Sequence, residues 1–163
     1  MKAEEQPEAQ EETKPLKFTL VRLFPKDIPK FWPLIKKCYI DDWTKGVPLT
    51  EEIMMKVLQF LSKGYSVVWA VKDSNQDVYG FCTTSINKDP LTDTFCLYFQ
   101  NVSIFRILPR RGWESCMEVF KKYAKDAGCV SIQGRTMERQ AKLYKRLGFN
   151  TETRVVIYDL QGD

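Results

Sequence analysis

The stretch from Phe95 to Phe149 constrains the fold more than any other part of the chain. It begins with FCLYFQNVSIF, a long aromatic and β-branched run that is typical of a buried strand. A short basic turn follows, and then a helix from Gly112 to about Ala127 whose apolar side chains recur at helical spacing. Gly128 ends that helix, and the strand CVSIQGR and the helix ERQAKLYKRLGF come directly after it. A strand–helix–strand crossover of this length predicts two parallel neighbours in one sheet.

The basic turn between the first strand and its helix predicts an anion site. Free backbone N–H groups and the helix dipole both favour an anion at the carboxyl end of such a strand. Gly112 and Trp113 are expected to supply N–H groups at the helix start. Guanidinium groups suit paired phosphate oxygens, and the arginines of the turn are Arg106, Arg110 and Arg111. Trp113 beside arginines is also a pairing found on nucleic-acid-binding surfaces.

The rest of the chain completes an order of β-α-α-β-β-β-α-β-α-β. Strands are predicted at 17–23, 65–72, 78–87 and 154–160, and helices from Asp27 to about Asp41 and after Thr50. Pro33 is an awkward residue for the first of these helices, because proline removes a backbone hydrogen bond. Three strands in hairpin order, followed by a crossover, predict a mixed sheet with helices on both faces.

Composition and charge narrow the classes of protein. Residues 1–15 are acidic and nearly devoid of large apolar groups, which predicts a disordered tail before a single domain at 16–163. No run of 18 apolar residues is present, so no membrane span is expected. The chain has no histidine and no CxxC pair, so no metal site is expected. Five scattered cysteines in apolar segments indicate reduced core thiols and a cytoplasmic setting.

The positive charge is concentrated in one region. Residues 106–146 hold 11 basic and 4 acidic side chains, whereas residues 1–13 hold one lysine and five glutamates. Such a field attracts an anion, which would be either a phosphate-bearing cofactor or nucleic acid. A solvated helix face rich in lysine is the alternative interpretation of the same charges. No recognised nucleic-acid-binding motif is present, so nucleic acid is the less favoured partner.

The segment AKLYKRLGF resembles the last motif helix of the GNAT superfamily of acyl-CoA-dependent N-acyltransferases. The matching residues are Ala141, Leu143, Tyr144, Gly148 and Phe149. The upstream strand, basic turn and helix match the acyl-CoA motif of that family in order and spacing. The resemblance implies an α/β (α+β) fold with a mixed, mostly antiparallel central sheet of six to seven strands.

The sequence departs from the family pattern at three positions. Pro109 replaces the leading Arg or Gln of the acyl-CoA motif, Glu114 replaces its second glycine, and Glu138 replaces the Asn of the final helix. A carboxylate beside a pyrophosphate is repulsive. Either Glu114 turns outward, therefore, or the phosphate site is altered or lost.

The resemblance also implies roles for particular residues. A backbone N–H near Ile104, Phe105 or Arg106 would polarise the thioester carbonyl, where the strand splays from its parallel neighbour. Tyr144 stands at the position of the tyrosine that protonates the leaving sulfur, and its unperturbed pKa of about 10 keeps it protonated. Residues that would line the acceptor site are Asp41, Asp42 and Trp43. No general base is assigned, so a water relay or an already neutral amine remains an alternative.

The function implied is N-acyl transfer, specifically N-acetyltransferase activity. The cosubstrate would be acetyl-CoA or another acyl-CoA, and the acceptor a small-molecule or peptide amine that attacks directly. One alternative is a catalytically inactive GNAT-fold binding or structural protein, which the three departures favour. A nucleic-acid-binding domain is the third hypothesis. The oligomeric state stays open, a homodimer included.

Overall fold

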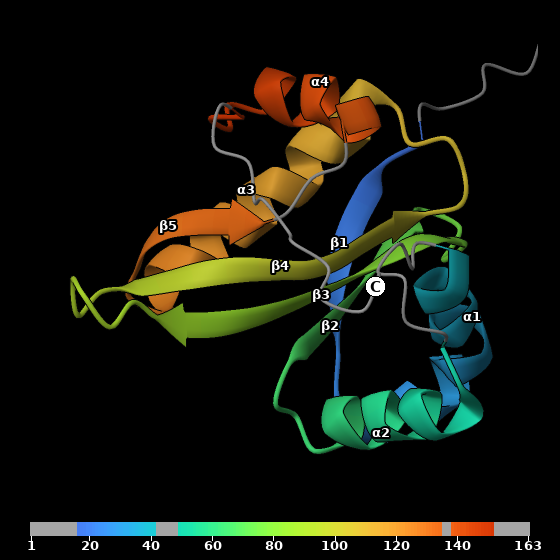
Figure 1. Ribbon diagram of the computed structural model, residues 1–163. Coiled ribbons are helices and arrows are strands. Elements are labelled where there is room, and N and C mark those ends of the chain that lie inside the picture. The colour runs from blue at the N-terminus through green and yellow to red at the C-terminus, as the bar shows by residue number, and fades with distance from the viewer. Residues whose placement is uncertain (1–15, 42–48, 135–137, 152–163) are drawn as a thin grey trace, which may run out of the picture.

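The fold is a five-stranded mixed sheet with helices on both faces (Figure 1). The computed structural model describes residues 16–41, 49–134 and 138–151. The strands lie side by side in chain order, and every neighbouring pair is antiparallel except the last, which is parallel. Their bounds are β1 Phe18–Leu23, β2 Val67–Asp73, β3 Val78–Lys88, β4 Phe95–Ile104 and β5 Cys129–Gly134.

The strand count differs from the expectation of six to seven. The described residues form five strands, and the sixth expected strand, at 154–160, lies outside them. The mostly antiparallel pairing, the helices on both faces and the parallel neighbours around the crossover are confirmed. The expected acidic tail at 1–15 also lies outside the described residues.

Two pairs of helices cover opposite faces of the sheet (Figure 1). After a short 3-10 turn at Pro25–Asp27, α1 (Ile28–Asp41) and α2 (Glu51–Ser62) pack on one face. The other face carries α3 (Arg110–Asp126) and α4 (Glu138–Arg146). The central strands are therefore buried on both sides, and successive residues of β2 alternate between the two cores. Val68 and Ala70 face α1 and α2, whereas Trp69 and Val71 face α3.

Local chemistry sets the helix ends. Thr50 caps α2 by accepting a hydrogen bond from the Ile53 N–H at 3.3 Å, as the sequence predicts. Pro33 lies within α1, on its exposed side, so the helix continues through the proline. None of the described helices combines the length and the apolar composition that a membrane crossing requires.

A bulge in β4 shapes the edge of the sheet where the candidate site lies. Thr83 of β3 pairs with Asn101, but the next residue, Thr84, pairs with Phe99, so Gln100 is the extra residue in β4. Bulges of this kind bend a strand and end its regular pairing, and they are frequent beside active sites. The pairing with β5 stops at the same place, where Gly134 lies opposite Phe99.

Candidate functional site

No strand among the described residues pairs with the outer edge of the carboxyl half of β4, which is called the free edge below. The strand runs on to Ile104, five residues beyond Phe99, where its pairing with the described part of β5 ends. On its other side, the Phe105 N–H donates to the Tyr79 C=O at 3.0 Å. Because backbone groups of an antiparallel pair alternate in direction, the N–H groups of Ile104 and Val102 point away from β3, toward this free edge.

The hydrogen bonds at this end of β4 reduce the number of backbone N–H groups that could polarise a thioester carbonyl. Ile104, Phe105 and Arg106 were all candidates, but the N–H groups of Phe105 and Arg106 both donate to the Tyr79 C=O, at 3.0 and 3.3 Å. Of these three donors, the Ile104 N–H is the one that no described residue engages. The Arg106 side chain lies over the Tyr79 ring at 5.4 Å and forms an ion pair with Asp77 at 3.3 Å.

Gly80 allows this end of β4 to approach β3 closely. A Cβ at Gly80 would lie 2.3 Å from the Ser103 carbonyl oxygen and 2.5 Å from the Ile104 Cδ1. Only glycine, which has no side chain, fits at this position. Gly80 therefore determines how close the Ile104 backbone lies to β3. Gly80 was not among the site residues predicted from the sequence, although a glycine inside a strand pattern is a recognised signal of close backbone approach.

The start of α3 offers donors two residues earlier than expected. Pro109 is the N-cap residue, and its C=O accepts hydrogen bonds from the N–H groups of Gly112 and Trp113 at 2.8 and 3.2 Å. Those two donors serve the helix itself. The N–H groups that a helix start leaves without an intrahelical partner are those of its first residues, here Arg110 and Arg111.

Gly112 has a packing role at this turn. It is buried, and a Cβ there would lie 2.6 Å from Leu108 Cδ1 and 3.1 Å from Phe18 Cδ2. The absence of a side chain therefore allows the first turn of α3 to sit directly on Leu108 and on β1. Gly112 therefore determines how close the start of α3 lies to the sheet.

The three arginines of the turn differ in their surroundings. Arg106 is paired with Asp77, and Arg110 Nε donates to Glu114 Oε1 at 2.7 Å. Arg111 is exposed and makes no ion pair among the residues that the structure describes. The Glu114 side chain is 48% exposed, and its carboxylate lies at the turn itself, bonded to one of the arginines expected to bind the phosphate.

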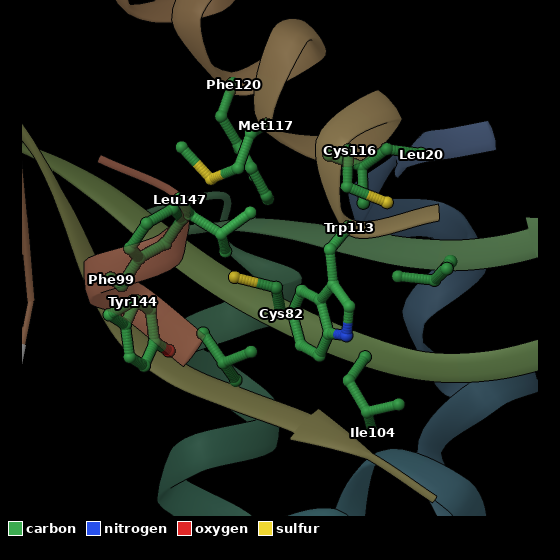
Figure 2. A pocket seen from close by; sticks show the side chains of 12 residues that line it. Leu20, Cys82, Phe99, Ile104, Trp113, Cys116, Met117, Phe120, Tyr144 and Leu147 are labelled. Atoms are coloured by element: carbon green, nitrogen blue, oxygen red, sulfur yellow. The ribbon is translucent and has the colours of Figure 1, made fainter. Parts of the chain in front are cut away.

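An apolar cavity of about 20 Å³ joins the elements of the site (Figure 2). It lies between the sheet, α3 and α4, and its wall includes Ile104 from β4, Trp113 from α3 and Tyr144 from α4. Three of the predicted site residues therefore meet at one cavity. Figure 2 shows the Trp113 indole projecting between Cys82 and Ile104. The Tyr144 ring packs edge-on against Phe149, with ring centroids 5.4 Å apart.

The two thiols of the cavity wall are poor nucleophiles. Burial raises the pKa of the Cys116 thiol to about 11. Burial, with a smaller effect of the neighbouring Cys116, raises the pKa of Cys82 well above its ordinary value. Both sulfurs are therefore neutral near pH 7, and reactive thiols need the ionised form. All five cysteines are free, as the sequence analysis expected.

The predicted acceptor residues are described only in part. Asp41 is the exposed last residue of α1, whereas Asp42 and Trp43 lie outside the described residues. Tyr39 anchors this end of α1 through a 3.2 Å hydrogen bond between its hydroxyl and Thr83 Oγ1. Thr83 pairs with Asn101, next to the bulge, so the end of α1 reaches β4 from the face opposite α3. The described residues hold no cluster of three or more potential metal ligands.

Comparison with known proteins connects this geometry to a fold. Neither the models of protein families nor the curated proteins give a match to the sequence. Solved structures do match. Glucosamine-6-phosphate N-acetyltransferase from Arabidopsis thaliana aligns over 89% of this chain and 99% of its own, with a TM-score of 0.63 and 14% identity.

Two further structures give the same result. An aminoglycoside N-acetyltransferase solved in complex with CoA aligns over 91% of this chain and 98% of its own, with a TM-score of 0.67 and 13% identity. A ribosomal-protein-alanine N-acetyltransferase from Brucella melitensis aligns over 90% and 99%, with a TM-score of 0.64 and 12% identity. The chain therefore has the fold of the GNAT superfamily. Identities this low establish the fold alone.

Proposed function

We propose that this protein is an N-acyltransferase that moves an acetyl group from acetyl-CoA to an amine. One observation carries the proposal. Residues from the end of β4, from the first turn of α3 and from α4 line one apolar cavity, which brings Ile104 and Tyr144 to the same part of the molecule. A donor to the carbonyl oxygen and an acid for the leaving sulfur are the groups that transfer from a thioester requires. The alignment with a CoA-bound acetyltransferase supports the same proposal.

The turn before α3 is suited to the pyrophosphate of acyl-CoA. Arg111 is exposed and makes no ion pair within the described residues, so its guanidinium can bind paired phosphate oxygens. The N–H groups of Arg110 and Arg111 lie at the positive end of the α3 dipole. Arg106 and Arg110 flank the same turn. The guanidinium of each can leave its carboxylate partner and bind a phosphate instead. Gly112 and Trp113 contribute by packing, through Leu108 and the cavity.

Acyl-CoA supplies a thioester. The neutral acceptor amine attacks the carbonyl carbon of that thioester. The Ile104 N–H, on the free edge of β4, donates to the carbonyl oxygen as negative charge develops there. The C–S bond breaks as the new C–N bond forms. The Tyr144 hydroxyl gives its proton to the leaving sulfur, and the amine loses one proton to water.

The acceptor binds at the end of α1. Asp41 is an exposed carboxylate there, and a carboxylate attracts a cationic acceptor that carries several amines or a basic peptide. Asp42 and Trp43 follow Asp41 directly in the sequence and belong to the same proposal. No carboxylate on the described part of β4 is available as a base, since positions 100 and 101 are Gln and Asn.

Calorimetric titration of the full chain with acetyl-CoA tests the proposal. We expect saturable binding at micromolar concentrations, and acetyl transfer to a panel of polyamines, aminoglycosides and basic peptides. The Tyr144→Phe variant removes the acid, so kcat should fall about 100-fold while the dissociation constant of acetyl-CoA stays within about twofold. An equal loss of affinity and turnover would assign Tyr144 to packing and contradict its role as the acid.

A GNAT-fold binding protein without catalysis is the second candidate. The specific observation in its favour is that two of the three arginines already have carboxylate partners, Asp77 and Glu114. Under this hypothesis acetyl-CoA at millimolar concentration gives no thermal shift. A ligand at 100 times its dissociation constant adds about 2.7 kcal/mol of stability, so a shift is readily measured where binding occurs.

A further inference from the structure

We propose that the acidic segment at residues 1–15 docks on the arginines of the turn before α3 and competes with anionic ligands for them. Docking depends only on the charges of the segment and of the turn, whereas a competition with acetyl-CoA rests on the proposed function. The proposal is based on the charge of the segment, on the place where it joins the fold, and on the exposure of the arginines.

The acidic segment carries the charge that the turn attracts. It holds five glutamates against two lysines, whereas residues 106–146 hold 11 basic and 4 acidic side chains. The glutamates are Glu4, Glu5, Glu8, Glu11 and Glu12. After Met1 the segment has no large apolar side chain, so it has little hydrophobic surface to bury against the domain. The contacts that it can offer to the domain are therefore mainly electrostatic.

The acidic segment enters the fold beside the turn. It leads into β1, whose first residue, Phe18, packs against the first turn of α3, where a Cβ at Gly112 would lie 3.1 Å from Phe18 Cδ2. The Phe18 ring also packs edge-on against Tyr79 at a centroid distance of 5.0 Å, and the Arg106 guanidinium lies over the same Tyr79 ring at 5.4 Å. Figure 1 shows the start of β1 beside the connection between β4 and α3. The chain therefore enters the sheet next to both ends of the arginine turn.

The glutamates nearest to β1 can reach the turn. Glu12 precedes Phe18 by six residues, and a chain of that length spans at most about 22 Å. Because Phe18 already packs against the first turn of α3, Arg110 and Arg111 lie within this span. A tether of a few residues raises the local concentration of the carboxylates to about the millimolar range. Individually weak contacts are therefore sufficient for docking.

The three arginines are accessible to the segment. The Arg110 side chain is 79% exposed and that of Arg106 is 49% exposed. Their carboxylate partners, Asp77 and Glu114, form surface ion pairs that contribute little stability, so a glutamate of the segment can replace either of them. Arg111 is exposed and makes no ion pair with a described residue, so it can bind a glutamate without losing such a partner.

Docking of the segment excludes a phosphate from the same guanidinium groups. The arginines of the turn are the groups proposed to bind the pyrophosphate of acyl-CoA. The apparent affinity for the cosubstrate is then lowered by the fraction of molecules in which the segment occupies the turn. An exposed ion pair shifts an equilibrium by up to about fivefold, so two such pairs can occupy the turn in most molecules.

Docking is tested by NMR on the isotope-labelled full chain. In the wild type, the amide resonances of Glu8, Glu11 and Glu12 should shift when about 1 M NaCl is added, since the Debye length then falls to about 3 Å. In the double variant Arg110→Gln with Arg111→Gln, the same resonances should stand at their high-salt positions already at low salt. Resonances of the segment that do not differ between the wild type and the double variant at low salt would overturn the proposal.

Lys121→Gln with Lys122→Gln provides the matched control. These substitutions also remove two exposed positive charges from α3, but about three turns further along the helix. The resonances of the segment should therefore stay at their wild-type positions, and a shift as large as in the arginine variant would overturn the assignment to the turn. Dilution of the protein should leave the resonances unchanged. A dependence on concentration would show that the segment binds a second copy instead, which contradicts docking within one chain.

Competition is tested by calorimetric titration of the full chain with acetyl-CoA at low salt. Replacement of the five glutamates by glutamine should tighten binding about three- to tenfold, because the segment then no longer occupies the turn. In Arg111→Gln the same five replacements should change the affinity by less than about twofold. Equal affinities of the wild type and the five-glutamine variant would overturn the competition and leave the proposed function standing. Failure of both proteins to bind acetyl-CoA would overturn the proposed function, while the resonances of the segment would still decide whether it docks.

Discussion

The close approach of β3 and β4 at Gly80 offers the most direct test of the site geometry. In Gly80→Ala the new Cβ would lie 2.3 Å from the Ser103 carbonyl oxygen and 2.8 Å from the Ile104 Cα. Both of these neighbours are backbone atoms of β4, so no side-chain rotation relieves the contact. The end of β4 has to move away from β3 instead.

The size of the effect follows from two opposing terms. Overpacking of a well-packed interior costs about 1–3 kcal/mol, and rigid backbone neighbours place this site at the upper end of that range. Replacing glycine with alanine recovers about 0.4–1 kcal/mol through the unfolded chain. The net loss is about 2 kcal/mol, which lowers the melting temperature by about 4–8 °C for a domain of this size. Because Ile104 moves with the strand, affinity for acetyl-CoA should fall at least about tenfold.

Thermal unfolding and acetyl-CoA titration of Gly80→Ala are best compared with Gly128→Ala. Gly128 follows α3 with φ +74°, and a Cβ there meets nothing within 4 Å. The control therefore loses about 1 kcal/mol through backbone strain and should keep its affinity for acetyl-CoA. A Gly80→Ala protein that melts within about 1 °C of the wild type would refute the reasoning, because the calculated clash would then carry no cost.

Three further predictions concern the start of α3 and its core. Glu114→Gln removes a carboxylate and frees Arg110, so acetyl-CoA should bind about fivefold more tightly, while stability changes by less than about 1 kcal/mol because the pair is exposed. In Gly112→Ala the added Cβ, 2.6 Å from Leu108 Cδ1, should lower the free energy of unfolding by about 1 kcal/mol, a net of overpacking and helix propensity that urea titration measures. The raised pKa of Cys116, about 11 against an ordinary 9.0, means that the unfolded thiol ionises first as pH rises. Stability should therefore be intact below pH 9 and fall toward pH 11, with about 2 kcal/mol of that fall due to Cys116. Cys116→Ala should make the slope less steep without abolishing it, because the raised pKa of Cys82 acts in the same direction. An unchanged slope in the variant would contradict the cause given.

The order of elements could be predicted because it depends on local patterns. The apolar spacing in the segment from Gly112 to Ala127, with Gly128 after it, gives a helix of the expected length in the structure, α3 at Arg110–Asp126. A strand–helix–strand crossover of this length places its two strands parallel in one sheet, and the pairing of β5 with β4 confirms that prediction. The end of β4 was also expected to separate from its parallel neighbour, and the described pairing stops at Phe99.

The division of hydrogen bonds at the site could not be predicted from local patterns. Whether the Gly112 N–H serves a ligand or the Pro109 C=O depends on where the helix begins, and residue types fix that only to within a turn. Likewise, the Phe105 N–H donates to the Tyr79 C=O because β3 and β4 lie side by side, so this N–H is not available to a ligand. The position of Gly80 opposite Ile104 depends on the register of β3 and β4, which includes a bulge.

If the turn binds a pyrophosphate as proposed, its ion pairs should lower the affinity without blocking the site. An exposed pair such as Arg110–Glu114 contributes about 0–1 kcal/mol, because water screens both partners. Hydrogen bonds between an arginine and a phosphate are worth about 1.5–3 kcal/mol, so a pyrophosphate can displace the carboxylate with a net gain. The glutamate that replaces the second motif glycine therefore weakens the anion site by roughly the energy of one surface pair. That weakening is smaller than the binding energy expected from the Arg111 guanidinium together with the N–H groups of Arg110 and Arg111. The departure from the family pattern at Glu114 is therefore compatible with an acyl-CoA site.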